Sequence, residues 1–541
     1  MERPSTGPLF SEVAAESGLD FVHRNGATGR FYLPETMHGG VAFLDFDNDS
    51  YLDVYLIQSG ALPPQPSKEP NGNRLFRNRG DGSFEDITQA AGVGDKSHGV
   101  GVAVADYDRD GWVDIYVTNL GANRLYRNNG PDAGGQVTFS DVTEEAGVGD
   151  PAYSTSATFL DFDKDGDLDL WVTNYVDWRT GLEHRCVGRN GLPDYCAPGT
   201  YEPVPDTLYR NDGEGANGIV AFTDVSESAG LLENPASGLG VVAADFDGDG
   251  YVDVYVANDQ LPNQMWINTG DGRFVDEALQ RGSALNEFGR AEAGMGVTAA
   301  DVDADGDWDL FSVHLSGESN TLYRNEGDFF RDATVESGLG FASVPYTGFG
   351  TSFFDFDHDG LLDLFIANGR VNRGEDLEPD FREPNQLLRG LPGGTFAAVT
   401  GAGAALELLE VSRGAAFGDY DNDGDLDILV GNNGGPVRLL RNELTERRHW
   451  LQVQLDGQPR FDRDAVGAEV IVESNGRRQR RMVQPGFSYC SSSDPRVHFG
   501  LGEAGSTVRL TVIWPDGERQ ILENVAADQR LEIAAPKPGS R

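Results

Sequence analysis

Long hydrophobic runs, basic residues and cysteine are all scarce in this chain of 541 residues. No run of 18 apolar residues occurs, which excludes a membrane-spanning helix. Lysine and arginine number 42 against 88 aspartates and glutamates, giving a net charge of −46. So acidic a surface repels nucleic acid and anionic membranes, and we expect cations as partners instead.

The first residues, MERPSTGPLFSEV, contain no apolar h-region, so no signal peptide is visible in this sequence. Cysteine occurs three times. Cys186 and Cys196 enclose a short loop, CVGRNGLPDYC, and we expect a disulfide between them, with two free thiols as the alternative. Cys490 is then left single.

What the chain does contain is a repeat. The pattern D-x-D-x-D-x-x-x-D recurs from residue 45 to residue 427, at starts separated by 54 to 84 residues. Self-similarity at such a period indicates a propeller or a solenoid. The seven copies are DFDNDSYLD at 45, DYDRDGWVD at 106, DFDKDGDLD at 161, DFDGDGYVD at 245, DVDADGDWD at 301, DFDHDGLLD at 355 and DYDNDGDLD at 419.

Each unit has the same internal order of four short, β-branched or aromatic segments divided by Gly, Asn and Asp turns. Four antiparallel strands per unit, repeated seven times, predict an all-β, seven-bladed β-propeller. A tiny residue stands five positions before each aspartate loop, as expected where inner strands converge on an axis. These residues are Gly40, Gly101, Ser156, Gly240, Gly296, Gly350 and Gly414.

The two ends of the repeat region fit together. The seventh unit stops after its third segment, VRLLRN (437–442), whereas the chain opens with LFSEVAAESGL (9–19), which matches a fourth segment. We therefore expect the N-terminal strand to complete the last blade and close the ring, which removes exposed sheet edges.

The aspartate loops predict calcium sites. Side chains at positions 1, 3, 5 and 9, with the carbonyl at position 7, offer the hard oxygen ligands that Ca²⁺ prefers, and glycine at position 6 permits the sharp turn. The expected ligands are Asp45, Asp47, Asp49, Tyr51 and Asp53; Asp106, Asp108, Asp110, Trp112 and Asp114; Asp161, Asp163, Asp165, Asp167 and Asp169; Asp245, Asp247, Asp249, Tyr251 and Asp253; Asp301, Asp303, Asp305, Asp307 and Asp309; Asp355, Asp357, Asp359, Leu361 and Asp363; and Asp419, Asp421, Asp423, Asp425 and Asp427.

Up to seven ions are expected, one per blade. The first loop is the weakest, because Ser50 replaces glycine and must adopt a costlier backbone. An EF-hand would place its last acid at position 12 between helices, Mg²⁺ would keep several waters, and plain acidic turns would not repeat so regularly.

The loop within GVAVADYDRDGWVDIYVTN resembles the FG-GAP/VCBS repeat, and GAEVIVESNGRRQRRMVQPGFSYCSSSDPRVHFGLGEAGSTVRLTVIWPDGERQ (467–520) resembles an ASPIC/UnbV domain. Together they resemble the CRTAC-like (cartilage acidic protein) family. The resemblance implies a secreted, calcium-binding protein, hence an extracellular or periplasmic location, although the absence of a visible leader leaves the cytoplasm open. The animal members also carry an EGF-like module that this sequence lacks.

Three segments are expected: a propeller at 1–445, a small β-sandwich at 446–535 and a flexible tail at 536–541. The sandwich is indicated by alternating apolar and polar residues. Its NGRRQRR hairpin carries Arg477, Arg478, Arg480 and Arg481, which could form a solvated strand face, dock onto the acidic propeller or hold an anionic partner.

The long connections of the repeat are expected on the face opposite the aspartate loops, where function tends to lie. They are residues 59–73, 175–206 and 369–385. Seven polar residues near the axial mouth of this face are catalytic candidates if the protein is an enzyme. They are His38, His98, Arg290, Glu292, His314, Tyr346 and Arg413. Surface residues without a particular role are the alternative.

The sequence therefore predicts a calcium-binding propeller that acts as a binding or interaction protein, with calcium mainly structural. A protein, glycan or small molecule would bind the loop-rich face. The alternative is a calcium-dependent enzyme of secondary metabolism, although no Ser-His-Asp, zinc-spaced His/Cys or P-loop pattern appears, so the balance is against catalysis. Enclosure of His38, His98, Arg290 and Arg413 in one pocket would favour the enzyme.

Overall fold

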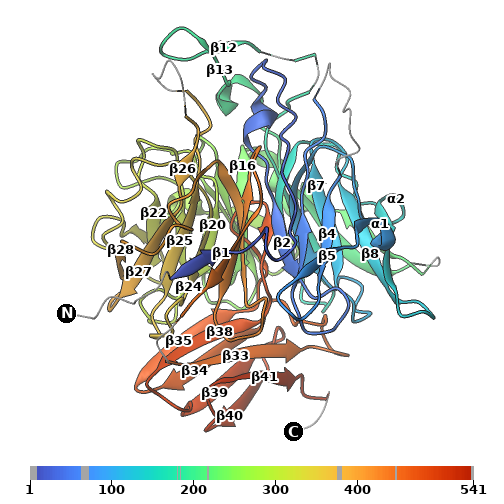
Figure 1. The fold of residues 1–541 in the computed structure, drawn as a ribbon, viewed down its shortest axis with the longest axis vertical. Coiled ribbons are helices and arrows are strands. Elements are labelled where there is room, and N and C mark those ends of the chain that lie inside the picture. The colour runs from blue at the N-terminus through green and yellow to red at the C-terminus, as the bar shows by residue number, and fades with distance from the viewer. Residues whose placement is uncertain are drawn as a thin grey trace.

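The computed structural model of the protein describes residues 9–62, 72–179, 181–182, 184–215, 218–373, 380–444 and 448–537. Within these ranges the fold is all-β: a ring of four-stranded sheets with a smaller pair of sheets beneath it (Figure 1). The tips of the 59–73 and 369–385 connections, the expected boundary at 445–446 and the end of the expected tail, 538–541, lie outside the described residues. No helix in the described part is long and apolar enough to cross a membrane.

Seven antiparallel sheets form the propeller, which we number as blades 1 to 7. Blade 1 contains β2 (Val41–Leu44), β3 (Asp53–Leu56), β4 (Arg74–Asn78) and β5 (Phe84–Asp86). Blade 2 contains β6 (Gly99–Ala105), β7 (Asp114–Asn119), β8 (Arg124–Pro131) and β9 (Val137–Asp141). Blade 3 contains β10 (Ser154–Leu160), β11 (Asp169–Asn174), β14 (Thr207–Glu214) and β15 (Val220–Asp224).

Blades 4 to 7 repeat this order. Blade 4 contains β16 (Gly238–Ala244), β17 (Asp253–Asn258), β18 (Gln264–Asn268) and β19 (Phe274–Asp276). Blade 5 contains β20 (Val297–Ala300), β21 (Asp309–Ser312), β22 (Thr321–Asn325) and β23 (Phe330–Asp332). Blade 6 contains β24 (Gly348–Phe354), β25 (Asp363–Asn368), β27 (Gln386–Leu391) and β28 (Thr395–Ala398), and blade 7 contains β30 (Ser412–Gly418), β31 (Asp427–Asn432), β32 (Arg438–Asn442) and β1 (Phe10–Glu12).

Short elements complete the propeller. Four single-turn helices follow outer strands: α1 (Thr88–Ala91), α2 (Thr143–Ala146), α3 (Ser226–Ala229) and α4 (Ala278–Arg281). Three 3₁₀ turns are η1 (Leu33–Thr36), η2 (Pro198–Thr200) and η3 (Leu231–Glu233), and β26 (Glu383–Pro384) pairs with β29 (Leu409–Glu410). The 175–206 insertion carries the hairpin β12 (Cys186–Val187) and β13 (Pro193–Asp194), which the Cys186–Cys196 disulfide closes as predicted.

The N-terminal strand takes the place that the sequence predicts, because β1 pairs with β32 as the fourth strand of blade 7. A second set of contacts links six of the blades to the preceding blade. Asn128 of blade 2 donates through Nδ2 to the carbonyl of Phe46 in blade 1, at 2.9 Å. Asn78 of blade 1 does the same to Tyr420 of blade 7, at 2.8 Å, across the point of closure.

The inner strands are almost entirely buried, because each is covered on both sides by its neighbours. All seven residues of β6, GVGVAVA, are buried. The small residue before each aspartate loop is needed for this approach: a Cβ added at Gly40 would lie 2.8 Å from the carbonyl oxygen of Val100 and would collide with that of Cys490.

The C-terminal part is a sandwich of two sheets, as predicted. One sheet contains β33 (His449–Asp456), β38 (Val497–Gly502) and β41 (Gln529–Ala534), and the other contains β34 (Glu469–Ser474), β35 (Arg477–Met482), β39 (Arg509–Ile513) and β40 (Arg519–Glu523). Leu451, Val470, Phe499 and Trp514 belong to its core. The turn at Asn475 and Gly476, both in the left-handed region, joins β34 to β35 as the Asn-Gly hairpin predicts.

One segment of the C-terminal part lies inside the propeller. Residues 484–496, which we name the axial segment, include β36 (Gly486–Phe487) and β37 (Ser491–Ser492), which join the sheet of blade 1 beside β2. Tyr489 and Cys490 are fully buried there. The axis of the propeller is therefore filled by the axial segment, which the sequence patterns do not predict.

Backbone groups of inner strands all round the ring bond to the axial segment. Val297 of blade 5 exchanges two backbone hydrogen bonds with Ser488, and the amide of Val102 in blade 2 donates to Cys490 at 3.2 Å. The Ser488 and Ser493 hydroxyls accept from the amides of Thr351 in blade 6 and Phe417 in blade 7. The axial segment thus provides hydrogen-bond acceptors for backbone amides that would otherwise be buried without an acceptor.

Ser156 of blade 3 is the exception in the glycine pattern, and its hydrogen bonds explain why serine stands there. Ser156 stands where six blades have glycine, and its hydroxyl accepts from the amide of Cys490 at 3.0 Å and donates to the carbonyl of Leu239 at 2.6 Å. The hydroxyl therefore ties the axial segment to blades 3 and 4.

Candidate metal centres and the opposite face

Six of the seven aspartate loops share one hydrogen bond. In these loops the carboxylate at position 1 accepts from the backbone amide at position 6, for example Gly250 to Asp245 at 2.9 Å and Ser50 to Asp45 at 3.2 Å. Position 6 has a left-handed backbone in every loop, and Ser50, at φ 71°, adopts it without being glycine. The first loop therefore contains the strained residue that the sequence predicts.

Position 4 is left-handed as well, which sequence reasoning missed. Only the fourth loop has glycine there, Gly248, and the other loops place larger residues at φ values between 58° and 66°. These residues are Asn48, Arg109, Lys164, Ala304, His358 and Asn422. The pair of left-handed residues folds each loop back on itself, so that its first and last aspartates approach each other.

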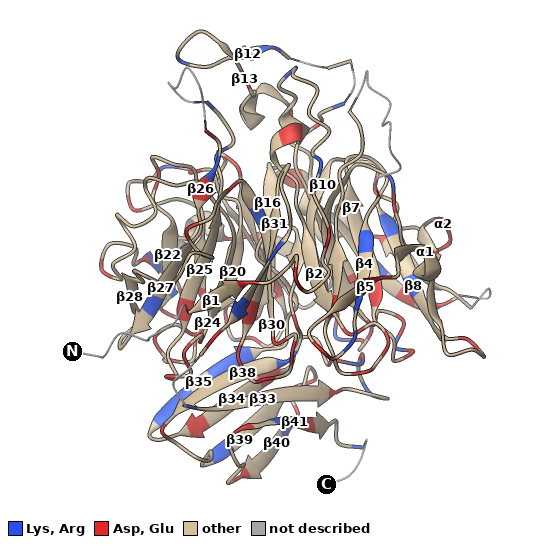
Figure 2. Cartoon of the chain, in the orientation of Figure 1, with Lys and Arg blue, Asp and Glu red and all other residues tan. Residues whose placement is uncertain are grey.

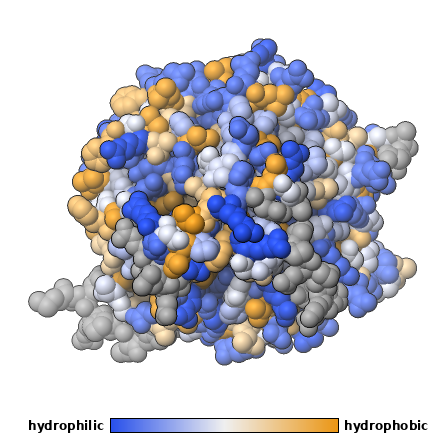
Figure 3. Space-filling model, turned by 90° about the horizontal axis from the view of Figure 1, so that it is seen from above, coloured by the Kyte–Doolittle hydropathy of each residue, from blue (hydrophilic) through white to orange (hydrophobic). Residues whose placement is uncertain are grey.

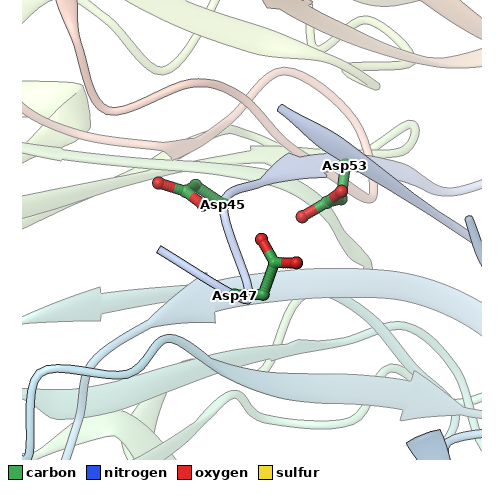
Figure 4. A group of neighbouring side chains, drawn as sticks. All are labelled: Asp45, Asp47 and Asp53. Atoms are coloured by element: carbon green, nitrogen blue, oxygen red, sulfur yellow. The ribbon is translucent and has the colours of Figure 1, made fainter. Parts of the chain in front are cut away.

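The loops bring three carboxylates together. Figure 4 shows Asp45, Asp47 and Asp53 around one point, with oxygens within 4.8 Å of one another. The same positions, 1, 3 and 9, form groups at Asp106, Asp108 and Asp114, at Asp161, Asp163 and Asp169, and at Asp245, Asp247 and Asp253, whereas the group in the fifth loop is made by positions 1, 3 and 5: Asp301, Asp303 and Asp305. A role for the remaining side chains at position 5 and for the carbonyls at position 7 stays a prediction.

The aspartate at position 9 is held in place by two backbone hydrogen bonds. Asp253 is fully buried, and its two oxygens accept the amides of Phe246 at 2.9 Å and Asn268 at 2.8 Å. Burial, as the largest effect, raises the pKa of Asp253 to about 8 and that of Asp309 to about 8. A cation at this point would oppose that rise, because it favours the ionised carboxylate.

The position 5 carboxylate has a structural role. Its oxygen accepts the amide at position 7, as in Tyr251 to Asp249 at 2.7 Å and Leu361 to Asp359 at 2.8 Å. These Asx turns hold the loop closed.

Two residues of the third strand were missed, although their motif, L-Y-R-N, repeats in the sequence. The arginine pairs with the carboxylate at position 3, as in Arg127 to Asp108 at 2.5 Å. The asparagine donates its amide nitrogen to the preceding blade, and its backbone amide binds the position 9 aspartate. Blade 6 has Gly390 in place of asparagine and keeps only the backbone contact, to Asp363 at 2.7 Å.

The C-terminal sandwich lies against the aspartate loops (Figure 1). Arg463 donates to the carbonyl of Asp45 at 2.9 Å, Gln458 to Asp106 at 3.3 Å and Arg477 to the carbonyl of Asp359 at 2.7 Å. Basic residues of β35 line the boundary, whereas acidic residues crowd the lower rim of the propeller (Figure 2). Of the open alternatives for the NGRRQRR hairpin, docking on the propeller is the one that the structure shows.

The opposite face carries the insertions. Three of its histidines form a buried cluster: His23 Nε2 and His38 Nδ1 lie 3.1 Å and 3.0 Å from the Ser59 hydroxyl, and the His38 and His98 ring centroids are 4.6 Å apart. Burial lowers the pKa of His23 to about 3 and that of His98 to about 4, so these imidazoles are neutral at pH 7.

The remaining catalytic candidates do not join this cluster. Arg413 is fully buried and donates to backbone carbonyls, including Thr36 at 2.6 Å and Gly369 at 2.8 Å, which is a structural role. Arg290 is exposed, and Tyr346 is half-buried. His314 Nδ1 donates to the Ser319 carbonyl at 2.9 Å and lies 3.9 Å from Glu292, in a separate pair.

Comparison with known sequences identifies the architecture. The family described as FG-GAP-like repeat matches residues 45–117, 106–172, 189–256, 245–312 and 301–366, more than half of the chain. The family described as ASPIC and UnbV matches residues 458–540. The chain belongs to the FG-GAP repeat family and carries an ASPIC/UnbV domain. The resemblance predicted from the sequence motifs is therefore confirmed.

Three curated CRTAC-like proteins are similar to it at 26% identity, and each is a cartilage acidic protein 1. The Mus musculus protein matches over 93% of this chain and 75% of its own length. The Homo sapiens protein matches over 82% of this chain and 64% of its own length, and the Xenopus tropicalis protein over 82% and 65%. The chain thus spans between about two thirds and three quarters of these relatives.

Solved structures are similar to the chain at low scores only. BP39L lectin from Burkholderia pseudomallei is 10% identical, with a TM-score of 0.43 over 75% of this chain and 96% of the lectin. An Agrocybe aegerita lectin that recognises non-reducing terminal N-acetylglucosamine is 18% identical, with a TM-score of 0.39 over 69% of this chain and 88% of that one. At such scores nothing about the ligand is transferred to this chain.

Proposed function

We propose that this protein is a calcium-loaded binding protein that presents the insertion-bearing face of its propeller to a ligand. The observation that carries the proposal is the docking of the C-terminal sandwich on the aspartate loops, with the axial segment filling the channel. A partner is therefore left with the opposite face, where the repeat breaks down into individual loops.

The donor chemistry of the loops fits calcium. Several carboxylate oxygens are buried and have no hydrogen-bond partner, among them Asp47 Oδ1, Asp106 Oδ1, Asp161 Oδ1 and both oxygens of Asp301. A buried anionic oxygen without a partner is costly, and a hard cation with six to eight oxygen ligands relieves that cost. Aspartates at positions 1, 3 and 9 would hold the ion. Its role would be to hold each loop together.

The first test is a pair of thermal melts, in millimolar Ca²⁺ and in EDTA. We expect a higher melting temperature in Ca²⁺, because the ion binds the folded loops and not the unfolded chain. Calorimetric titration should show the loop with Ser50 as the weakest site, and Ser50→Gly should strengthen it. Coincident melts in Ca²⁺ and EDTA would contradict the calcium assignment.

The insertion-bearing face has features of a binding surface. Val187, Phe288 and Phe341 on its loops are 68%, 75% and 90% exposed, and hydrophobic patches interrupt the hydrophilic surface in Figure 3. Exposed large apolar side chains often mark interaction sites. Together with the disulfide, these features support an extracellular or periplasmic binding protein.

The enzyme alternative is not favoured, because the four residues chosen to distinguish it do not share one pocket. His38 and His98 are in contact, but the Arg413 guanidinium donates to backbone carbonyls and Arg290 lies on the surface.

The binding face is tested with a glycan and protein array in Ca²⁺. Any ligand captured by the parent should be lost in a Val187→Asp, Phe288→Asp, Phe341→Asp variant. It should be retained in a Leu279→Asp, Val335→Asp control, whose exposed apolar residues follow outer strands. Equal loss or equal retention in the two variants would contradict the assignment of the face.

A further inference from the structure

A cavity that is partly open to solvent lies at the axial mouth of the insertion-bearing face. It has a volume of about 80 Å³. Its lining includes Met37 and Met295, which precede inner strands, and Tyr195, Cys196 and Pro198 of the disulfide-closed insertion. We name it the axial cavity.

One charged side chain lines this cavity, that of Asp259. Asp259 is 8% exposed, and the Tyr175 hydroxyl donates to its Oδ2 at 2.5 Å. In the described part of the chain, no lysine or arginine forms an ion pair with it, and the nearby charge that acts on it is the like charge of Glu318. The carboxylate is therefore buried without a counter-ion.

Other buried acids on the same face have more partners, either an arginine or several hydrogen-bond donors. Glu383 pairs with Arg370 at 3.0 Å, and Glu35 accepts two hydrogen bonds from Thr28 and one from Tyr195. The Asp259 carboxylate accepts a hydrogen bond from the Tyr175 hydroxyl and lines the axial cavity. Burial, as the largest effect, raises its pKa to about 7. A buried carboxylate in this state is neutralised either by a proton or by a cation that enters the cavity.

The walls suit an organic cation. Tyr175 and Tyr195 line the cavity, and aromatic rings attract ammonium groups, while Met37, Met295 and Leu315 line it with polarizable and apolar groups that suit the carbon part. The charge of −46 adds a negative potential that concentrates cations at the mouth. An anion would meet the like charge of Asp259, and a neutral molecule would leave that carboxylate without a counter-ion.

We propose that the axial cavity binds a small organic ammonium ion, with Asp259 as its counter-ion and Tyr175 holding that carboxylate in place. The inference rests on the proposed function in one respect: it assigns a ligand class to the face that the sandwich leaves open. Because Tyr195, Cys196 and Pro198 belong to the insertion, the ligand would also contact the segment that distinguishes blade 3 from the other blades.

The experiment is calorimetric titration of the calcium-loaded chain with n-propylammonium, methylammonium and tetramethylammonium, and with n-propanol as the neutral isostere. At least one ammonium ion should bind and n-propanol should not. Asp259→Asn should weaken binding by tenfold or more, and Tyr175→Phe should weaken it less. Glu287→Gln, which removes one exposed carboxylate from the same face, should bind as the parent does.

Thermal melts in Ca²⁺ show whether each variant is folded. The inference is overturned if none of the three ions binds, if Asp259→Asn binds as tightly as the parent, or if K⁺ displaces the bound ion at equal concentration. Failure here leaves the calcium melts and the array result unchanged, so it is distinguishable from failure of the proposed function. Conversely, coincident melts or a failed array test would not alter an ammonium affinity that depends on Asp259.

Discussion

Single carboxylates set the behaviour of the aspartate loops. Asp106 and Asp161, at position 1 of their loops, have pKa values raised to about 7, by burial first and by neighbouring aspartates next. In the unfolded chain such groups titrate near the ordinary value of about 4. The folded chain therefore binds more protons between these two values, and the stability from this source is lost as the pH rises through about 7.

This yields a pH prediction. In EDTA, the melting temperature should fall as the pH rises from 6.5 to 8, because the ionised carboxylates repel one another. In saturating Ca²⁺ the same rise in pH should leave it nearly constant, because the ion prefers ionised ligands. The histidines with lowered pKa values act only below this window and affect both series equally. Parallel curves in EDTA and Ca²⁺ would rule out the loops as the source.

The third-strand asparagines give a second residue-scale prediction. Asn268 donates to the carbonyls of Phe162, in blade 3, and Val252, at 2.8 Å and 3.2 Å. Asn268→Ala should leave these buried acceptors unpaired and cost about 1–3 kcal/mol of unfolding free energy. Urea denaturation in Ca²⁺ measures it.

Asn129→Ala is the matched control, because Asn129 is exposed and bonds only to side chains of its own hairpin. A loss of stability no larger than that of the control would show that the asparagine does not link the blades.

At the scale of elements, the sequence predicts what repeats. The strands, the blade order, the turn at Ser50 and the closing role of β1 all follow from local patterns that occur seven times or complete a missing copy. The axial segment could not be predicted in this way. It occurs once, and the partners of Ser488 and Cys490 lie on strands about 140 to 390 residues away along the chain, for example Thr351 and Val102.

The candidate site shows the same division. The aspartates were identifiable because carboxylates at fixed spacing have one plain chemical use. The polar residues at the axial mouth were not, because their roles depend on which groups tertiary packing leaves unpaired. Arg413 looked reactive and is bound to carbonyls, whereas Asp259 follows an ordinary strand and carries no motif.

The axial segment predicts the reactivity of Cys490. The thiol is buried, and burial raises its pKa to about 12, so little thiolate forms and reagents cannot reach it. Alkylation by iodoacetamide at pH 8 in Ca²⁺ should be slower than in denaturant by about a hundredfold or more. Mass spectrometry of the modified peptide measures it. Comparable rates in the two conditions would show that the segment does not occupy the axis.

At the scale of the whole molecule, the two parts of the chain are interlocked. The sandwich contacts the loops from below while its own segment runs up into the ring, and arginines such as Arg463 and Arg477 face the most acidic part of the propeller. Such an interface combines charge complementarity with a buried core.

We predict that cutting the chain between the parts will not separate them. With a protease site engineered at residues 445–447, the nicked protein should elute from size exclusion in Ca²⁺ as a single species, and should separate in denaturant. A control with Ser488→Pro, Cys490→Pro, which disrupts the bonds of the axial segment, should separate more readily. Separation of the unmodified nicked protein under native conditions would contradict the interlocked arrangement.

The location of the axial segment also sets an order of assembly. Synthesis runs from the N-terminus, so all seven blades leave the ribosome before residues 484–496 are available. Until then, inner-strand amides such as those of Val102, Val297 and Thr351 have only water as a partner. We therefore expect a nascent propeller to have an open axial channel. The channel is filled only after nearly the whole chain has been translated. Truncated products would be recognisable to chaperones by that open channel.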